Sequence, residues 1–324
     1  MDATAGANSL PQTVTSGQLV TVTVPATSAN LGPGYDSLGL ALGLRDTLTV
    51  ETLDTGALEF DLEGEGAKTL PRNASHLVAR TINAALGELG YQHNGLKITA
   101  NNVNPQGRGL GSSASAIVGA VVAANALVPE EAQKPSSWVL QFCSALEGHP
   151  DNVAPAIFGA LALSWQDGES YSSTRAEVNP NIVPVVAIPD FELATEAARA
   201  LLPTSVAHHV AAMNSGRAAL LIHALTHRPE LLLPATQDYL HQDYRAEAML
   251  PSAELIQALR ARGHAAVVSG AGPTVLTLTH SDAEALEVTA LIHELTENQR
   301  SKGTWRVHAL SVDPEGAKVE VHRR

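Results

Sequence analysis

The amino-acid sequence predicts an α+β protein made of two domains. With 324 residues, the chain is longer than a single hydrophobic core usually serves. Hydrophobic residues make up 44% of it, which is enough to bury a large core. In the second half, strand-like and helix-like segments follow in the order β-α-α-β-β-α-β, which is typical of helices packed on an antiparallel sheet.

The first domain is predicted at residues 18–175, after a loose polar tail at residues 1–17. It begins at residues 19–24, where Val and Thr alternate as in a half-buried strand. A Pro/Gly turn at residues 25–36 follows. Further strands are expected at residues 48–53, 58–62, 96–103 and 157–165, and helices at residues 76–89, 114–127 and 135–146.

The second domain is predicted at residues 176–324, because the polar segment 166–180 is the expected connection between the domains. Its strands are expected at residues 182–188 and 305–312, and on both sides of a glycine turn within residues 265–279. Its helices are expected at residues 191–199, 206–226, 253–262 and 282–296.

Composition and charge limit the possible partners. The formal net charge of −13 disfavours nucleic acid and anionic membrane surfaces, since both are negatively charged. No apolar run is long enough to cross a membrane, and the N-terminus lacks a basic-then-apolar signal. The single cysteine, Cys143, has no partner for a disulfide within the chain, which suits a reducing compartment. We therefore expect a soluble cytoplasmic protein.

The stretch GRGLGSSASAIVGAVVAANAL at residues 107–127 is the strongest local signal. Its alternate glycines let the backbone adopt positive φ and let a ligand approach closely. They precede Ser112 and Ser113, which we expect to cap the following helix. Because a glycine turn leading into a helix N-terminus favours anions, the stretch predicts a phosphate site. It lacks the lysine of a Walker loop and the spacing of a dinucleotide fingerprint, and a turn that only permits tight helix packing stays open as the alternative.

Two charged side chains stand at helix positions that need an explanation. Glu147 falls in the last turn of a helix, next to Gly148, where the helix dipole disfavours negative charge. A bound cation would compensate it; the alternative is that Glu147 points into water. Thr195 and Arg199 share a helix face, and the alternative to a functional role is a surface helix in which Glu196 pairs with Arg199.

The histidines of the second half favour a structural explanation. His223 and His227 have the i,i+4 spacing of zinc ligands, but Ala224 stands where a zinc-protease motif needs glutamate. Solvated or packed histidines are therefore favoured over a metal site. The same interpretation applies to His208, His209 and His241.

Three glycine-bearing segments stand together in this chain: PATSANLGPGYD at residues 25–36, PQGRGLGSSASA at residues 105–116 and SGAGPTV at residues 269–275. In this order and spacing they resemble the three motifs of the GHMP kinases. Asn30 and Asp36, six residues apart, are similar to the homoserine kinases within that family. So are EGHPDNVAP at residues 147–155, the helix with Thr195 and Arg199, and the Tyr244-Arg245 segment. The resemblance covers residues 18–315.

The resemblance implies a ribosomal protein S5 domain 2-like fold for the first domain and a ferredoxin-like fold for the second. It implies a homodimer. The implied activity is the ATP-dependent phosphorylation of the side-chain hydroxyl of L-homoserine, a step of threonine biosynthesis, with ATP and Mg²⁺ as cofactors.

For the nucleotide, the resemblance implies that the glycine loop wraps the phosphates of ATP with its amides. Ser113 and Glu147 would hold Mg²⁺, which usually takes few protein oxygens besides those of substrate phosphates. Near the base, family members often carry an Asn-Leu pair where this chain has His76-Leu77, so no contact with the base is assigned to Asn73 or His76. The residues expected at the nucleotide are Pro105, Gly107, Arg108, Gly109, Leu110, Gly111, Ser112, Ser113, Ala114 and Ser115.

For the acceptor, Arg199 and Arg245 match the family positions that hold the substrate carboxylate, and Asp36 matches the position that holds the ammonium. The same pocket would be lined by His149, Asn152, Thr195 and Gly270. Phosphoryl transfer depends on alignment and charge neutralisation more than on a strong base. We therefore expect two catalytic residues: Asn30, which orients the hydroxyl, and Arg199, which reaches the transferring group.

Two other functions stay open. A kinase with another acceptor, such as mevalonate, would share the fold, but mevalonate has no ammonium for Asp36 to bind. A non-catalytic nucleotide-binding protein could keep the same scaffold. Against it stand Ser113, Glu147 and the two arginines of the acceptor pocket.

Overall fold

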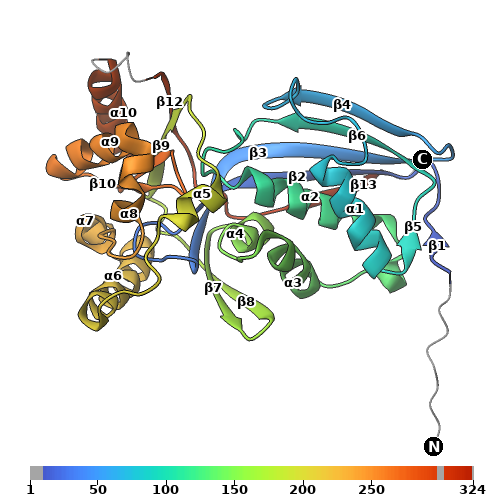
Figure 1. Cartoon of the computed structure of the whole chain (residues 1–324), viewed down its shortest axis with the longest axis horizontal. Coiled ribbons are helices and arrows are strands. Elements are labelled where there is room, and N and C mark those ends of the chain that lie inside the picture. The colour runs from blue at the N-terminus through green and yellow to red at the C-terminus, as the bar shows by residue number, and fades with distance from the viewer. Residues whose placement is uncertain (1–9, 298–302, 323–324) are drawn as a thin grey trace, which may run out of the picture.

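The computed structural model describes residues 10–297 and 303–322 and has the α+β architecture that the sequence predicts (Figure 1). The first nine residues of the expected tail lie outside the described part. Within the rest of that tail, β1 (Gln12–Thr13) pairs in parallel with β5 (Tyr91–Gln92).

The larger sheet carries the first half of the chain. Its strand order is β13-β2-β3-β6-β4, with β7 paired to β3 and β8 paired to β7. Only β4 and β6 are parallel among the pairs of this sheet in the described residues. The strands are β2 (Leu19–Ala29), β3 (Leu38–Leu53), β4 (Leu58–Gly64), β6 (Gly95–Asn102), β7 (Leu161–Asp167), β8 (Ser170–Ala176) and β13 (Lys318–His322).

Helices α1 (Leu77–Glu88), α2 (Ser112–Leu127), α3 (Ser136–Glu147) and α4 (Val153–Phe158) lie on one side of this sheet (Figure 1). In β2 the alternation of Val and Thr turns Val20, Val22 and Val24 into the core beneath them. The central helix α2 is made of small and aliphatic residues on every side because it packs against β2, α1, α3 and α4.

The smaller sheet carries the second half, with the antiparallel order β10-β11-β9-β12. Alternate residues of β9 enter two different cores: Val185 and Ala187 join the cluster of α9 and α10, and Val186 and Ile188 join the cluster of α6. The strands are β9 (Val183–Pro189), β10 (Ala265–Val268), β11 (Val275–Thr279) and β12 (Trp305–Ala309). The helices are α5 (Thr195–Ala200), α6 (His208–Thr226), α7 (Leu232–Ala235), α8 (Gln242–Arg245), α9 (Leu250–Ala261) and α10 (Asp282–Glu297), with short 3-10 turns at Glu130–Ala132, Pro229–Leu231 and Ala246–Met249.

Four expectations need correction. Strand β2 runs five residues further than predicted, to Ala29, because a bulge between Pro25 and Ala26 accommodates the proline. Strand β3 begins before the predicted strand 48–53 and is continuous from residue 38 to residue 53. The predicted strand 157–165 begins only at Leu161, because the short helix α4 occupies the residues before Gly159. Most of the expected connection 166–180 is the β7–β8 hairpin, so residues 177–182 join the halves.

The last strand, β13, pairs antiparallel with β2. Residues 318–322 therefore extend the sheet of the first half, although the predicted second domain includes them. The domain limits as a whole stay a prediction. None of the helices in the described part of the chain has an apolar stretch that could cross a membrane.

Candidate active site

A cavity of about 240 Å³ opens between the two halves of the molecule and collects loops from both. Its walls include most of the residues that the sequence singles out: Asn30, Asp36, Gly107, Gly109, Gly111, Ser112, Ser113, Glu147, His149, Asn152, Thr195, Arg199, Arg245 and Gly270. Asp151, Leu193 and Ala271 line it as well and were not predicted.

The glycine loop enters this cavity at the N-terminus of α2. Gly109 and Gly111 have φ values of 75° and 67°, and a Cβ at Gly109 would collide with the Ser269 carbonyl. Gly111 is the N-cap, and no side chain caps the helix, so the expectation that serines cap it is wrong. Among the described residues, the amides of residues 112–114 find no hydrogen-bond acceptor. They remain free to bind an anion.

Several side chains of the loop point away from the cavity. Arg108 donates to the carbonyl oxygens of Pro189 and Asp190 and forms an ion pair with Glu192, N–O 3.0 Å. The side chains of Pro105, Leu110 and Ala114 are buried in the protein and line neither this cavity nor the second cavity described below, whereas Ser115 lines the second one. At four positions, those of Pro105, Arg108, Leu110 and Ala114, only the main chain is placed to meet a ligand.

A second cavity, of about 300 Å³, shares Gly107, Ser112 and Ser113 with the first. Its walls are mainly apolar and come from β2, β3, β6, α1 and α2, with residues of the glycine loop. His76 lines it; its Nδ1 accepts the Val78 amide, and its buried Nε2 has no partner among the described residues. Asn73 does not line this cavity. Its Oδ1 accepts hydrogen bonds from the amide and the hydroxyl of Ser75.

The Glu147 carboxylate turns into the main cavity. Its Oε2 accepts a hydrogen bond from the Ser113 hydroxyl, O–O 3.0 Å, so the alternative that Glu147 points into water is wrong. Burial raises the pKa of Glu147 above its ordinary value, and the Ser113 hydrogen bond only partly opposes this effect. No group of three or more His, Cys, Asp or Glu in the described chain could hold a metal ion by itself.

Arg199 and Asp36 form a bidentate ion pair on the opposite wall. Arg199 Nη1 and Nη2 donate to the two carboxylate oxygens, at 2.8 and 2.9 Å. Nη1 also donates to the Tyr35 hydroxyl, at 2.8 Å. The alternative partner of Arg199, Glu196, is thereby excluded. Asp36 and Arg199 were expected to bind different groups of a ligand, and the structure shows that they also bind each other.

Arg245 is buried, with an exposed fraction of 1%. Its Nε donates to the Ala198 carbonyl at 3.2 Å, and its Nη1 lies 3.1 Å from His241 Nδ1. Burial lowers the pKa of Arg245, although a guanidinium stays charged at neutral pH. Within the described chain no carboxylate forms an ion pair with it, and this buried charge faces the cavity.

Asn30 is held by both ends of its side-chain amide. Nδ2 donates to the Gly270 carbonyl at 2.8 Å, and Oδ1 accepts the Asp36 amide at 2.9 Å. Its φ of 70° lies in the left-handed region, which asparagine tolerates better than most residues. Asn30 thus joins the first and third glycine-bearing segments. Each of its amide atoms keeps capacity for one further hydrogen bond.

The turn between α3 and α4 supplies the remaining polar wall. His149 Nδ1 lies 2.6 Å from Asp151 Oδ1, and Asp151 is 2% exposed. Although burial alone would lower it, the pKa of His149 is raised, because the Asp151 carboxylate outweighs burial. Asn152 Oδ1 accepts the Thr27 hydroxyl at 2.8 Å.

The sequence prediction also missed two residues that lie behind the cavity lining. Tyr35 lies between the arginines, with each guanidinium carbon 5.6 Å from the ring centroid. His241 touches Arg245 from behind and is four residues away on the chain, so the i,i+4 spacing within LHQDYR is a signal that could have found it. His223 and His227 are both exposed and stack on each other at 5.5 Å between ring centroids, in agreement with solvated histidines.

Comparisons with known proteins place these features in context. The model of the GHMP kinases N terminal domain matches residues 76–160, and that of the GHMP kinases C terminal domain matches residues 216–294. A homoserine kinase of Streptomyces avermitilis is 50% identical over 301 residues, which cover 93% of this chain and 95% of the relative. One from Streptomyces coelicolor is 49% identical over 303 residues, with 93% and 94% covered. The crystal structure of homoserine kinase from Cytophaga hutchinsonii superposes with a TM-score of 0.82 at 26% identity, covering 93% of this chain and 97% of that one.

Proposed function

Because the chain belongs to the homoserine kinases of the GHMP kinase family, we propose that it transfers the terminal phosphoryl group of ATP to the side-chain hydroxyl of L-homoserine. The products are O-phospho-L-homoserine, used in threonine biosynthesis, and ADP. One observation carries the proposal: unpaired amides at the start of α2 open into the same cavity as Arg199, Arg245 and Asp36. A triphosphate site and an amino-acid site therefore adjoin.

The nucleotide would lie across the two cavities. Its phosphates would bind the free amides of residues 112–114, where the α2 dipole also favours negative charge. Its base would enter the apolar second cavity, which begins at Ser112 and Ser113. At Arg108, Leu110 and Ala114, whose side chains point away, the contacts would come from main-chain amides.

The residues present fit a magnesium ion. Ser113 and Glu147 offer two neighbouring oxygens, and burial, which raises the pKa of Glu147, disfavours a negative charge there that a bound cation would stabilise. Since the described chain has no larger cluster of ligands, phosphate and water oxygens would complete the shell, as is usual for Mg²⁺. When bound, Mg²⁺ would neutralise charge on the phosphates.

The charges of the acceptor pocket match a zwitterionic amino acid. Arg245 has no carboxylate of its own in the described chain and suits the substrate carboxylate, with Arg199 beside it. Asp36 keeps lone pairs beyond its bond to Arg199 and suits the ammonium. Mevalonate, the acceptor considered as an alternative, would leave Asp36 without a cationic partner.

In the reaction, the hydroxyl oxygen of homoserine forms a bond to the γ-phosphorus while the bond to the ADP oxygen breaks. Asn30 would orient the hydroxyl with the free capacity of its amide, which its bonds to Gly270 and Asp36 hold rigidly. Arg199 would stabilise charge on the transferring group. The hydroxyl proton leaves with the phosphate product or to solvent, and we assign no side chain as base.

An ADP-release assay with homoserine, mevalonate, shikimate and galactose tests the function. Turnover is expected with homoserine alone among the four. Preference for mevalonate would support the alternative acceptor. Nucleotide binding without turnover of any acceptor would instead indicate a non-catalytic nucleotide-binding protein.

We further propose a cytoplasmic homodimer, on the family resemblance. The single, buried Cys143 suits a reducing compartment, and the net charge of −13 suits a small-molecule enzyme more than a partner of nucleic acid. Light scattering of the purified protein measures the oligomeric state, and a monomer mass would contradict the dimer.

A further inference from the structure

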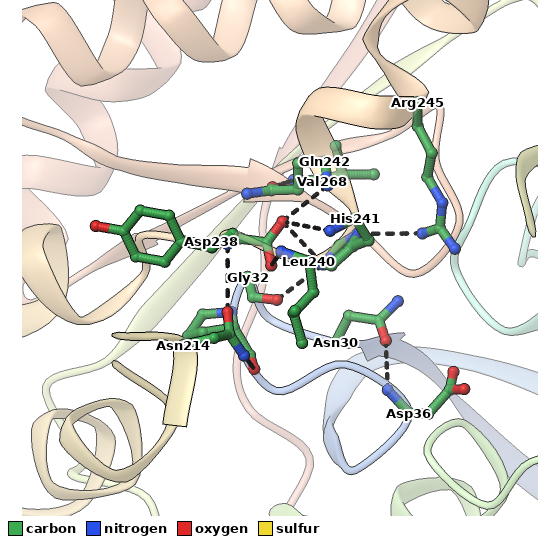
Figure 2. Close-up of polar contacts among 12 residues, drawn as sticks. Asn30, Gly32, Asp36, Asn214, Asp238, Leu240, His241, Gln242, Arg245 and Val268 are labelled. Atoms are coloured by element: carbon green, nitrogen blue, oxygen red, sulfur yellow. Dashed lines mark hydrogen bonds and ion pairs between the residues drawn. The ribbon is translucent and has the colours of Figure 1, made fainter. Parts of the chain in front are cut away.

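His241 lies directly behind the acceptor pocket, out of contact with solvent. It precedes α8 and stands between two parts of the site: the Arg245 guanidinium on one side and the turn after β2 on the other. Figure 2 shows the imidazole between these groups, with Asn30 and Asp36 on the turn below. Its 0% exposure means that every polar atom of the ring needs a protein partner.

The hydrogen bonds of His241 fix its charge. Nε2 lies 2.8 Å from the Gly32 carbonyl, which can only accept, so Nε2 carries the proton. Nδ1 lies 3.1 Å from Arg245 Nη1, which can only donate, so Nδ1 carries none. The ring is therefore a neutral imidazole that accepts from a cation. Burial, which lowers the pKa of His241, favours the same state.

The carboxylate of Asp238, which lies near the His241 ring, accepts hydrogen bonds from backbone amides and not from Arg245. Its Oδ1 accepts the Leu240 amide at 3.0 Å, and its Oδ2 accepts the amides of His241 and Gln242 at 3.0 and 2.8 Å (Figure 2). These bonds hold the segment that leads into α8. Asp238 Oδ2 is 3.7 Å from His241 Nε2, on the side of the ring that does not bond Arg245.

The two arginines of the pocket therefore differ in their support. Arg199 is bound by the Asp36 carboxylate, which neutralises it. Arg245 is bound by a neutral ring and by the carbonyl oxygens of Ala198 and Gly270, which fix its position, and no carboxylate of the described residues forms an ion pair with it. A fixed guanidinium without an ion-pair partner is the better partner for an incoming carboxylate.

We propose that His241 is a positioning residue for the carboxylate subsite: its neutral imidazole holds Arg245 in place without neutralising it and ties Arg245 to the turn that carries Asn30 and Asp36. This inference rests on the proposed function, because it concerns the affinity of the same site for its amino-acid substrate.

Three substitutions of His241 distinguish two effects on Arg245: the loss of its hydrogen-bond acceptor and the addition of a negative charge next to it. His241→Gln keeps a neutral side chain that can accept from Arg245 and donate to Gly32, and its KM for homoserine should stay within about threefold of the wild type. His241→Leu leaves the guanidinium without this acceptor, and its KM for homoserine should rise about tenfold or more. His241→Glu places a negative charge on Arg245 and should raise this KM at least as far as His241→Leu. In all three the KM for ATP should change less than about twofold, since the substitutions do not touch the nucleotide cavities.

The matched control is Asn214→Leu. Asn214 joins the same two segments, since its Nδ2 donates to the Pro33 carbonyl at 2.8 Å and its Oδ1 accepts the Tyr239 amide at 3.2 Å. It does not touch Arg245 (Figure 2). Asn214→Leu should lower thermal stability yet leave the KM for homoserine within about twofold.

A double-mutant cycle with Arg245→Gln completes the test. If His241 acts through Arg245, the increase in KM caused by His241→Leu should disappear in the Arg245→Gln background, whereas independent effects would multiply. Because KM does not depend on the fraction of folded enzyme, partial misfolding of one variant leaves the comparison valid.

The inference would be overturned if the effects of His241→Leu and Arg245→Gln on the KM for homoserine multiplied in the double variant. It would also be overturned if Asn214→Leu raised this KM as much as His241→Leu does. An unchanged KM for homoserine in His241→Glu would overturn it as well. If the wild type fails to phosphorylate homoserine at all, the proposed function itself is wrong, which is a different result from a wild type that turns over and shows no coupling between positions 241 and 245.

Discussion

Arg199 and Asp36 bind each other through two parallel hydrogen bonds of 2.8 and 2.9 Å, although they come from sequence positions 163 residues apart. One is on α5 of the second half and the other is on the turn after β2, so the pair joins the two halves at the cavity wall. The pair also makes the two pocket arginines unequal, because Arg245, on the other side of Tyr35, has no such carboxylate among the described residues. The pocket thus offers one net positive position, at Arg245, and one negative side chain, Asp36, that is part of an ion pair.

The first prediction concerns the negative position. Asp36→Asn should raise the KM for homoserine by about tenfold or more, because the ammonium loses a charged partner. The same variant should lose little activity on 4-hydroxybutyrate, which is homoserine without its ammonium. The measurement is the ratio of kcat/KM for the two acceptors. A ratio equal to that of the wild type would mean that Asp36 does not bind the ammonium.

A second prediction concerns the cation. Glu147→Gln should increase the Mg²⁺ concentration needed for half-maximal activity and lower kcat, because the amide is a weaker ligand than a carboxylate. Ser113→Ala should have a smaller effect in the same direction. Ser115→Ala is the control: its hydroxyl bonds the Pro25 carbonyl at 3.0 Å inside the protein, so its magnesium dependence should not change. An identical magnesium titration for Glu147→Gln and wild type would remove Glu147 from the metal site.

Asn30 provides a third prediction. Asn30→Ala should depress kcat far more than it raises the KM for ATP, since the amide is expected to orient the hydroxyl and not the nucleotide. Loss of the bonds to Gly270 and Asp36 should also lower thermal stability. Kinetics with both substrates varied separate these effects. An unchanged kcat in the folded variant would refute the orienting role.

The sequence is most informative where function depends on the main chain. A phosphate site at a helix N-terminus needs glycines, a turn and free amides, and all of these leave a local pattern in residues 107–116. The alternation in β2 and the apolar composition of α2 likewise follow from packing on one sheet. The short helix α4 was missed because six residues are too few to show a helical period.

Side-chain partners from distant segments could not be predicted from patterns. The contact of His241 with Gly32 spans 209 residues, and that of Asn30 with Gly270 spans 240. Glu196 is the obvious partner of Arg199 on the sequence, but Asp36 takes that place because the fold brings a better-aligned carboxylate to it. Only the tertiary structure decides between a local and a distant partner.

The last prediction concerns pH and stability. Asp46 lies at the edge of the second cavity and accepts the amides of Val103 and Asn104 at 2.7 and 2.9 Å, which fixes the start of the glycine loop to β3. Burial raises the pKa of Asp46 from 3.8 to about 6, more than these two hydrogen bonds lower it.

Because the folded protein holds this proton more tightly than the unfolded chain does, the contribution of Asp46 to stability is complete below pH 3.8 and is lost as the pH rises through about 6. Asp46→Asn keeps an oxygen for both amides and does not ionise. The free energy of unfolding of Asp46→Asn minus that of the wild type should therefore increase from pH 4 to pH 7, by about 1–2 kcal/mol after allowance for solvent screening. Denaturant unfolding of both proteins at each pH measures this difference, and a difference that is constant with pH, or that falls, would show that Asp46 ionises without cost in the folded state.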